Sequence, residues 1–372
     1  MERRRTVVVA PDSFKGSIGA VDAAAAIARG WLRERPDDRV VFLPQADGGE
    51  GTLDVIAAAV PDAVHHNTGD VTGPDGRPRP GAWLELPGGV GVVELAQASG
   101  LPLMAGPDAL GASTRGLGEV IRHAMEHAIA SLVIGLGGSA STDGGAGALA
   151  ALGLELLDSR NSRLADGGGA LARLDRIERA RLLPPPAAGV ALLADVTAPL
   201  LGPSGAARVF GPQKGAGLDE VAALEAGLAR LATLLGGEPE QAGAGAAGGT
   251  AYGFAAAWGA SIESGARRIQ ELTGLDLALR DADVVLTGEG RLDATSLAGK
   301  VVGELLATAK GRVPVGIIAG QVASGPDRAH LQAWTCSLAD LAGSARAALG
   351  HPVRHLEEAG AAAARHFANI AG

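Results

Sequence analysis

Short apolar runs alternate with amphipathic segments from the start of the chain. Residues 6–10 and 39–43 are runs of strand length rich in β-branched side chains, and each leads into a polar loop and a helical pattern. Apolar positions spaced for one helix face predict a helix over residues 17–35, which Pro36 ends, and a shorter helix that ends at Val60. Two successive strand–loop–helix units indicate a parallel α/β sheet, in which ligands collect at the carboxyl ends of the strands.

The pattern changes between residues 64 and 95. Turn sequences at residues 73–76 and 87–89 separate short apolar runs, as in β-hairpins, so we place a domain boundary near Asn67. Beyond it the α/β pattern resumes. It predicts strands at residues 132–134, 190–194, 284–286, 315–318 and about 334–338. It also predicts helices at residues 114–130, 146–152, 219–235 and 353–370, and a further helix that follows residues 243–249 and ends at Trp258.

Composition limits the class of protein. The 372 residues suggest two domains, and only 3% of them are aromatic, so the cores must consist of Ala, Val, Leu and Ile. A net charge of −9 argues against a nucleic-acid binder or a membrane-surface protein. No apolar run has the length of a membrane span or a signal peptide, and the single Cys336 is compatible with a reducing compartment. We therefore predict a soluble cytoplasmic protein that binds a small molecule, and neither nucleic acid nor a membrane.

A glycine-rich stretch, LVIGLGGSASTDGGAG at residues 132–147, joins a predicted strand to a predicted helix. Its backbone N–H groups and glycines could hold a phosphate or a carboxylate. The alternative is an ordinary turn in a chain that contains 57 glycines. The residues with which the loop would hold an anion are Gly137, Gly138, Ser139, Thr142, Gly144 and Gly145.

Lysine is scarce and its placement is selective. The chain has only Lys15, Lys214, Lys300 and Lys310, and the first three adjoin a glycine in a loop-like motif. A compact ammonium group among glycines suits a phosphate or carboxylate oxygen. Compositional drift toward arginine would explain the small number of lysines but not where they stand.

Five loops carry carboxylates, and several of them follow predicted strands. They contain Asp12 with Lys15, Asp47 with Glu50, Asp143, Asp195, and Glu289 with Asp293. A single Gly-Asp loop is usually a turn. Five of them, together with a glycine-rich loop and Lys214, supply the parts that phosphoryl transfer needs: ligands for Mg²⁺, a phosphate cradle, a cation and a base.

Other motifs are weaker. Gly135-x-Gly137-x-x-Ala140 with Glu155 resembles a dinucleotide fingerprint, but the loop continues where that fingerprint has a helix. His123 and His127 match a zinc-peptidase pattern but lie opposite the apolar stripe of their helix, so we predict a solvated face. His351 and His355 are likewise predicted at the surface, and no Walker phosphate-binding loop is present.

Seven stretches occur in order between Ala10 and Asp293: APDSFKGS, ADGGEGT, GLGGSASTDGGAGALAALG, DVTAPL, VFGPQKGA, GAGAAGG and LTGEGRLD. Together they resemble the signatures of the bacterial type I glycerate kinases. The resemblance implies ATP-dependent phosphorylation of D-glycerate at the 2-hydroxyl, with Mg²⁺. It also implies two α/β domains, with the active site in the cleft between them: a flavodoxin-like parallel-sheet domain of residues 1–66 and 275–372, and an inserted mixed α/β domain of residues 67–274. Ser141 and Ala198 depart from the family, where asparagine is common.

Roles for the candidate residues follow from these motifs. Lys15 would contact the substrate carboxylate or the transferring phosphoryl group, and Asp47 and Asp195 would be base and metal ligand in either order. Asp293 would be a second metal ligand. The Gly137–Gly145 loop and Lys214 would bind the nucleotide phosphates. Two alternatives stay open: a nicotinamide-dependent hydroxy-acid dehydrogenase, and a non-catalytic protein that binds a sugar acid.

Overall fold

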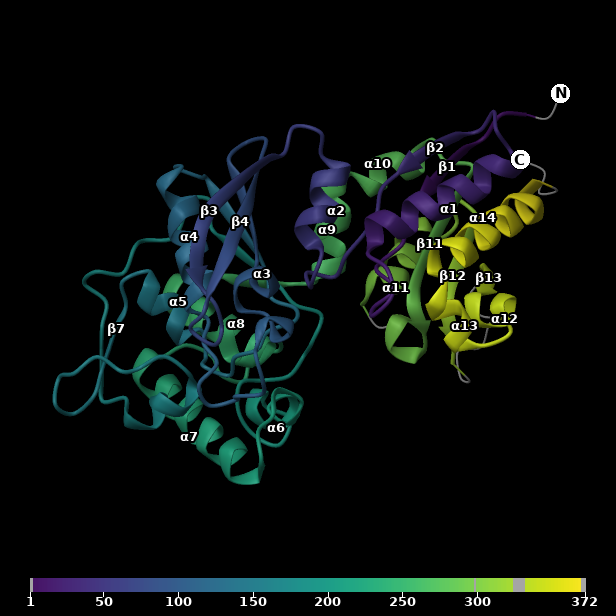
Figure 1. Cartoon of the computed structure of the whole chain (residues 1–372). Helices are drawn as coiled ribbons and strands as arrows, with labels where there is room; N and C mark the ends of the chain where they lie inside the picture. The colour runs from purple at the N-terminus through teal and green to yellow at the C-terminus, as the bar shows by residue number, and fades with distance from the viewer. Residues whose placement is uncertain (1–2, 298, 324–331, 369–372) are drawn as a thin grey trace. The chain divides into compact units, whose positions relative to one another are not determined.

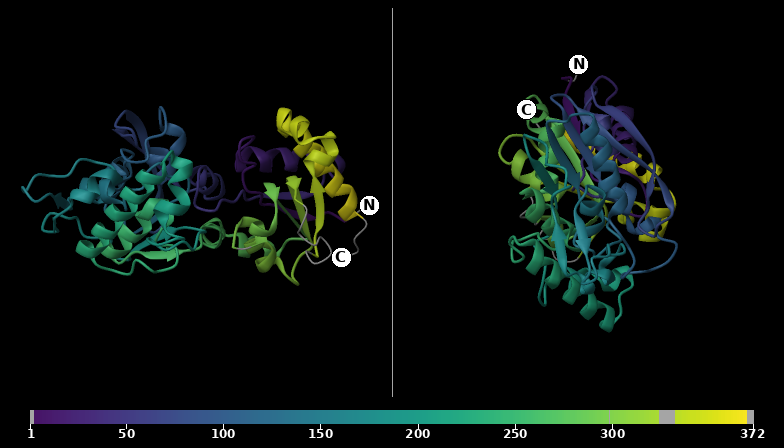
Figure 2. Two further views of the ribbon diagram at one scale, coloured as in Figure 1. Left: turned by 90° about the horizontal axis from the view of Figure 1, so that it is seen from below. Right: turned by 90° about the vertical axis from the view of Figure 1, so that its left-hand side faces the viewer.

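A computed structural model describes residues 3–297, 299–323 and 332–368. The chain divides into two compact units, which we call unit 1 and unit 2. Unit 1 comprises Met1–Asp47, Asp54–Pro61 and Ala266–Gly372, and unit 2 comprises Gly48–Leu53 and Asp62–Gly265. The N-terminal and C-terminal parts of the chain therefore fold together in unit 1, as the purple and yellow segments show (Figures 1 and 2).

Unit 1 is built on a five-stranded parallel sheet with the order β13-β12-β11-β1-β2. In chain order this is 2-1-3-4-5, the flavodoxin-like arrangement, so the predicted fold of this part is confirmed. Its elements are β1 (Thr6–Val9), α1 (Ala20–Glu34), β2 (Arg39–Phe42), most of α2 (Thr52–Ala59), α9 (Gly265–Thr273), α10 (Leu275–Arg280), β11 (Val284–Leu292), α11 (Val301–Ala309), β12 (Val315–Val322), β13 (Trp334–Ser337), α12 (Leu338–Ala342), α13 (Ala345–Gly350) and α14 (Pro352–Ala368), with a 3-10 turn at Ala294–Leu297.

Helices cover both faces of this sheet because successive side chains of a strand point in opposite directions. On β1, Val7 and Val9 belong to a core with Ile27 of α1 and Phe367 of α14. Val8 belongs to a second core, which contains residues of α10 and α11. The apolar run that predicted β1 is therefore buried on both sides, and the strand is firmly anchored under the loop that follows it.

Strand β11 is longer than the sequence predicts. The apolar run indicated a strand at residues 284–286 and a loop over residues 287–293, but β11 continues to Leu292 and pairs with β12 as far as Val322. The prediction was wrong because a parallel neighbour supplies hydrogen bonds even to a polar, glycine-containing segment. Glu289 consequently stands on a strand, where the ladder fixes its backbone.

Unit 2 contains a mixed sheet with the order β10-β9-β6-β5-β4-β3. The hairpin strands β3, β4 and β5 pair antiparallel and the others pair in parallel, which confirms the predicted mixed α/β architecture. Its elements are β3 (Val64–Thr72), β4 (Pro78–Leu86), β5 (Val90–Glu94), α3 (Leu95–Ser99), α4 (Arg115–Glu126), β6 (Ser131–Gly135), α5 (Ala146–Ala151), β7 (Glu155–Leu157), β8 (Arg176–Glu178), β9 (Val190–Leu193), α6 (Ala206–Phe210), α7 (Leu218–Leu235), α8 (Ala246–Trp258) and β10 (Ser261–Glu263), with 3-10 turns at Leu101–Leu103, Gly168–Arg173 and Pro212–Lys214.

One continuous core holds unit 2 together. It joins strand residues such as Trp83 and Ile134 to residues of the surrounding helices, such as Leu117, Leu228 and Phe254. Aliphatic residues dominate it, as the low aromatic content predicts. Within the part of the chain that the structure describes, no helix has both the length and the apolarity that a bilayer crossing requires.

Candidate active site

A pocket of about 360 Å³ lies in unit 1 at the carboxyl ends of its parallel strands. Asp12 and Lys15 follow β1, Asp47 follows β2, and Glu289 lies on β11. Strands β1 and β11 are neighbours at the point where the strand order reverses, which is where open α/β sheets bind their ligands. The fold thus brings together residues from three separate sequence motifs.

Local hydrogen bonds hold the loop after β1. The Phe14 and Ser17 amides donate to Ile18 and Phe14 carbonyls at 2.9 Å each, which closes a tight turn with Lys15 at its tip. The side chain of Lys15 is 75% exposed, and its Nζ lies 3.9 Å from Asp47 Oδ2. This long ion pair leaves the ammonium group able to contact a ligand.

The carboxylates of the pocket are crowded, and their pKa values reflect it. Burial and, to a smaller extent, the negative charge of Asp47 raise the pKa of Asp12 to about 7. The Ser13 amide donates a hydrogen bond to Asp12 Oδ1 at 2.6 Å, which opposes this rise in the pKa. Burial also raises the pKa of Glu289 to about 6. Glu289 Oε1 is buried and has no hydrogen-bond partner among the described residues. Carboxyl groups with raised pKa values in a pocket are candidates for binding or proton transfer.

Asp293, a predicted metal ligand, also lines this pocket. Its Oδ1 accepts hydrogen bonds from the Thr295 amide at 2.9 Å and the Thr295 hydroxyl at 2.6 Å. Hydrogen bonds from Thr295 lower the pKa of Asp293, so its carboxylate is stabilised in the charged form by its own turn. The structure therefore places Asp293 with Asp47 in unit 1, with Oδ1 bound by Thr295 and Oδ2 3.6 Å from Arg291 Nε.

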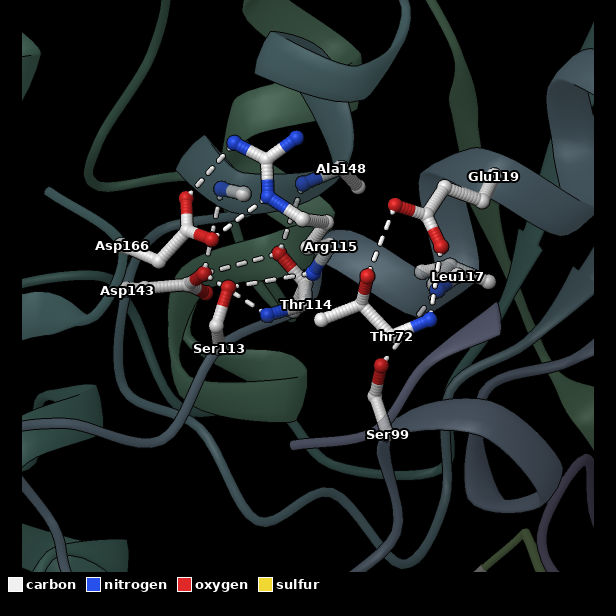
Figure 3. Close-up of polar contacts among 11 residues, drawn as sticks. Thr72, Ser99, Ser113, Thr114, Arg115, Leu117, Glu119, Asp143, Ala148 and Asp166 are labelled. Atoms are coloured by element: carbon white, nitrogen blue, oxygen red, sulfur yellow. Dashed lines mark hydrogen bonds and ion pairs between the residues drawn. The ribbon is translucent and has the colours of Figure 1, made fainter. Parts of the chain in front are cut away.

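Asp143, at the centre of the glycine-rich stretch, is an internal carboxyl group of unit 2. It is fully buried, and its Oδ2 accepts hydrogen bonds from the Thr114 amide at 2.9 Å and the Thr114 hydroxyl at 2.8 Å (Figure 3). The Gly145 amide donates to its Oδ1 at 3.1 Å and the Gly147 amide to its Oδ2 at 3.2 Å. Burial raises its pKa, whereas these hydrogen bonds lower it. The first N–H groups of α5 thus bind a carboxylate of the same loop.

Other N–H groups of the predicted phosphate loop are also used inside unit 2. The Gly137 amide donates to the Gly48 carbonyl and the Gly144 amide to the Gly248 carbonyl, at 3.0 Å each. The backbones approach so closely that a Cβ at Gly248 would come within 2.1 Å of the Ser141 carbonyl. This explains the glycines of GAGAAGG, in which Ala247, Gly248 and Gly249 adopt left-handed conformations at the start of α8.

Lys214 contacts the same loop from the interior of unit 2. It is buried, and its ammonium group donates to Ser139 Oγ at 2.9 Å and to the Ser141 carbonyl. Burial lowers its pKa to about 8. The nearby hydroxyl groups of Ser141 and Thr142 are buried without hydrogen-bond partners among the described residues. The role of Lys214 and this loop in binding nucleotide phosphates stays a prediction.

Asp195 belongs to unit 2 and follows β9, as the sequence predicts. Its Oδ1 accepts a hydrogen bond from the Gly265 amide at 2.8 Å, at the start of α9. The structure thus shows a positional role for one carboxylate oxygen, which is compatible with the turn-forming alternative and with a functional one.

The substitution Asp195→Asn separates these two roles. An amide oxygen can still accept the Gly265 hydrogen bond, but asparagine is no base and a poor ligand for Mg²⁺. If Asp195 is functional, the variant should melt at the wild-type temperature and lose on the order of 10²-fold in kcat. A kcat near the wild-type value would assign Asp195 to the turn alone.

Glu94 is a further residue that contacts the segment after Asp47, and no sequence motif marks it as a candidate. This buried residue ends β5, and its carboxylate oxygens accept hydrogen bonds from the Gly51 amide at 3.2 Å and the Leu53 amide at 3.1 Å. It therefore holds the segment directly after Asp47. The one feature in the sequence that could indicate Glu94 is its place at the end of an apolar run. A glutamate at a strand end can equally lie at the surface, so the sequence pattern alone does not identify it. Asp12 and Glu289 stand in two of the carboxylate-bearing loops that the sequence indicates, but they are not among its predicted site residues.

Two histidines, His123 and His355, are less exposed than the sequence predicts. His123 is half-buried and receives the Trp83 indole N–H on Nδ1 at 3.0 Å, and the rings of His66 and His127 pack on the same indole, so this face is only partly solvated. The prediction that His355 lies at the surface is wrong: it stands on the buried face of α14, with Nδ1 3.0 Å from Glu358 Oε2. Among the described residues, no group of three or more His, Cys, Asp or Glu side chains is arranged to hold a metal ion.

Unit 1 has a flavodoxin-like sheet with lysine and carboxylates at its switch point, and the chain has a second, mixed α/β unit. This combination indicates an α/β enzyme that acts on a small polar molecule. The model of the glycerate kinase family matches residues 7–368, and this chain belongs to that family. The predictions of the family, the fold class and a kinase activity are thereby confirmed, and the dehydrogenase and non-catalytic alternatives are not supported.

The individual relatives agree with this assignment. Glycerate 2-kinase of Escherichia coli (strain K12) is 39% identical over 326 residues, which cover 85% of each chain. Glycerate kinase of Bacillus subtilis (strain 168) is 40% identical over 331 residues, with the same coverage. A crystal structure assigned to glycerate kinase 2 of Salmonella typhimurium LT2 superposes with a TM-score of 0.82 at 34% identity, over 98% of each chain.

Proposed function

We propose that this protein transfers the γ-phosphoryl group of ATP to the 2-hydroxyl of D-glycerate, with Mg²⁺. The observation that carries the proposal is the pocket at the β1/β11 switch point, where Lys15 lies beside Asp12, Asp47 and Glu289 in a member of the glycerate kinase family. Phosphoryl transfer needs a base for the acceptor hydroxyl and positive charge for the transferring group, and the pocket contains side chains for both.

Asp12 and Asp47 are suited to accept the proton of the acceptor hydroxyl. A pKa of about 7 for Asp12 lies close to the pH at which a general base works best. The exposed ammonium group of Lys15 would compensate the negative charge of the substrate carboxylate or of the transferring phosphoryl group. Asp195, in unit 2, remains a candidate for base or metal ligand on the strength of its motif.

The donor set fits Mg²⁺ that arrives with a nucleotide. Mg²⁺ is typically held by one or two carboxylates together with substrate phosphates, rather than by a complete protein cage. Glu289 Oε1, buried and without a partner among the described residues, is an oxygen of this kind, and Asp47 and Asp293 line the same pocket. When bound, Mg²⁺ would neutralise charge on the phosphates.

The reaction can be tested directly. Purified protein should form ADP when ATP and D-glycerate are both present. Enolase added to the product mixture should form phosphoenolpyruvate without phosphoglycerate mutase, because enolase uses 2-phosphoglycerate. If phosphoenolpyruvate forms only when mutase is added, the product is 3-phosphoglycerate and the acceptor is the 3-hydroxyl. Reduction of NAD without ADP formation would overturn the kinase proposal.

The metal is tested separately. In excess chelator, activity should fall below detection, and added Mg²⁺ or Mn²⁺ should restore it, because the phosphates would otherwise keep their full negative charge. Turnover at the full rate in excess chelator would contradict the assignment of Mg²⁺.

A further inference from the structure

The pocket at the β1/β11 switch point has two sides of opposite character. One side is charged and carries Lys15, Lys300 and the carboxylates described above. The other is an apolar wall formed by Leu338 of α12, Ala348 and Leu349 of α13, and Pro352 at the start of α14. We refer to these four residues as the apolar wall.

The wall has an unusual exposure pattern. Leu338 and Ala348 are buried, so the base of the wall is packed into unit 1. Leu349, in contrast, is 58% exposed although it lines the pocket. An exposed leucine in a pocket leaves apolar surface that a ligand can cover, and covering it is favourable.

These two sides do not match the acceptor substrate. Glycerate is a small hydroxy acid whose surface is almost entirely polar, so it can use the charged side but gains nothing from the wall. A nucleoside triphosphate has a flat, largely apolar base at one end and anionic phosphates at the other. The volume of about 360 Å³ also falls within the range of about 300–1,000 Å³ that is usual for ligand pockets of this kind.

We propose that the apolar wall of unit 1 binds the base of the nucleoside triphosphate, with the phosphate chain directed to Lys15 and Lys300. The proposal rests on the proposed function in that ATP is the phosphate donor. It also differs from the prediction made from the sequence, because it assigns the nucleotide phosphates to unit 1 and not to the Gly137–Gly145 loop. Several N–H groups of that loop already have partners within unit 2, which leaves fewer of them for a phosphate.

Two exposed leucines provide a matched test. Leu349 lines the pocket, whereas Leu341 on α12 is 45% exposed and does not line it. Leu349→Asn and Leu341→Asn replace similar exposed surface with a neutral polar side chain, so neither should prevent folding. Leu349→Asn should raise the Kd of a non-hydrolysable ATP analogue, measured by calorimetry without glycerate, roughly five- to tenfold, and Leu341→Asn should leave it unchanged.

Tripolyphosphate shows whether the base is what the wall recognises. It has the phosphates but no base, so its Kd should be the same for the wild type and both variants. In kinetics, Leu349→Asn should raise the KM of ATP and leave the KM of glycerate and kcat unchanged. Four results would overturn the inference. In binding, they are an equal effect of Leu349→Asn on the Kd of tripolyphosphate, equal binding of the analogue by all three proteins, and no binding of the analogue by the wild type. In kinetics, it is an effect on the KM of glycerate alone.

The outcomes also separate this inference from the proposed function. Nucleotide binding is measured without an acceptor, so a Leu349-dependent Kd would stand even if glycerate were not phosphorylated. Conversely, phosphorylation of glycerate with no dependence on Leu349 would overturn the base site and leave the proposed reaction intact.

Discussion

Replacing Asp12 by asparagine is expected to remove most of the activity and, at the same time, to stabilise the folded protein at pH 8. Burial, and next the charge of Asp47, raise the pKa of Asp12 to about 7, so above that pH the folded protein holds a carboxylate where its charge is disfavoured. Asparagine removes the charge and keeps an oxygen that can accept the Ser13 amide hydrogen bond. Without the carboxylate, kcat should fall by on the order of 10²- to 10³-fold.

The effect on stability has a defined pH dependence. The carboxyl group ionises near 3.8 in the unfolded chain and near 7 in the folded protein, so between these values the folded state binds more protons. The free energy of unfolding of the wild type should therefore fall as the pH rises from 4 to 7. Asp12→Asn should be more stable than the wild type by on the order of 1–2 kcal/mol at pH 8 and should lose this advantage towards pH 4.

Urea denaturation at several pH values, with kcat measured in parallel, tests this prediction. Asp37→Asn is a suitable control because Asp37 is exposed in the turn before β2 of the same unit; it should change neither quantity. An Asp12→Asn variant that keeps wild-type kcat, or that is less stable than the wild type at pH 8, would contradict the assignment of Asp12 to the site.

Replacing Lys15 by alanine should lower kcat/KM by on the order of 10²-fold or more, the effect of losing a group that stabilises developing charge. The melting temperature should not change, because the Lys15 side chain is 75% exposed and its ion pair with Asp47, at 3.9 Å, is long. The ammonium group is therefore available for a ligand and contributes little to folding.

Lys310→Ala is the matched control for this experiment. Lys310 is one of the four lysines of the chain and is exposed at the end of α11, but it does not line the pocket. Its variant should have wild-type kinetics. If Lys15→Ala lowers the melting temperature while activity per folded molecule is preserved, Lys15 has a structural role instead.

The elements that the sequence predicted well have strong local signals. The apolar run at residues 6–10 and the helical pattern that ends at Pro36 correspond to β1 and α1. The run at residues 190–194 corresponds to β9, with Asp195 directly after it. Such signals are reliable because a strand buried on both faces, or a helix with one apolar face, needs the same side-chain period wherever it packs.

Predictions that depended on surroundings were less reliable. The segment after residue 286 lacks an apolar run, which is typical of a loop, but pairing with β12 makes it a strand. His355 has polar neighbours in sequence, yet the packing of α14 buries it. In both cases the deciding interactions come from residues that are distant in the chain, and no local pattern contains them.

The sequence by itself determined the family motifs, the α/β class and which loops carry carboxylates and lysines. Only the tertiary structure decided which of them meet: Asp12, Asp47 and Glu289 come from distant segments and converge because the carboxyl ends of parallel strands lie at one edge of the sheet. It also decided that Asp143 and Lys214 face inward, since their partners Thr114 and Ser139 lie far away in sequence. Burial and proximity set the charge state of these groups, and both are properties of the folded chain.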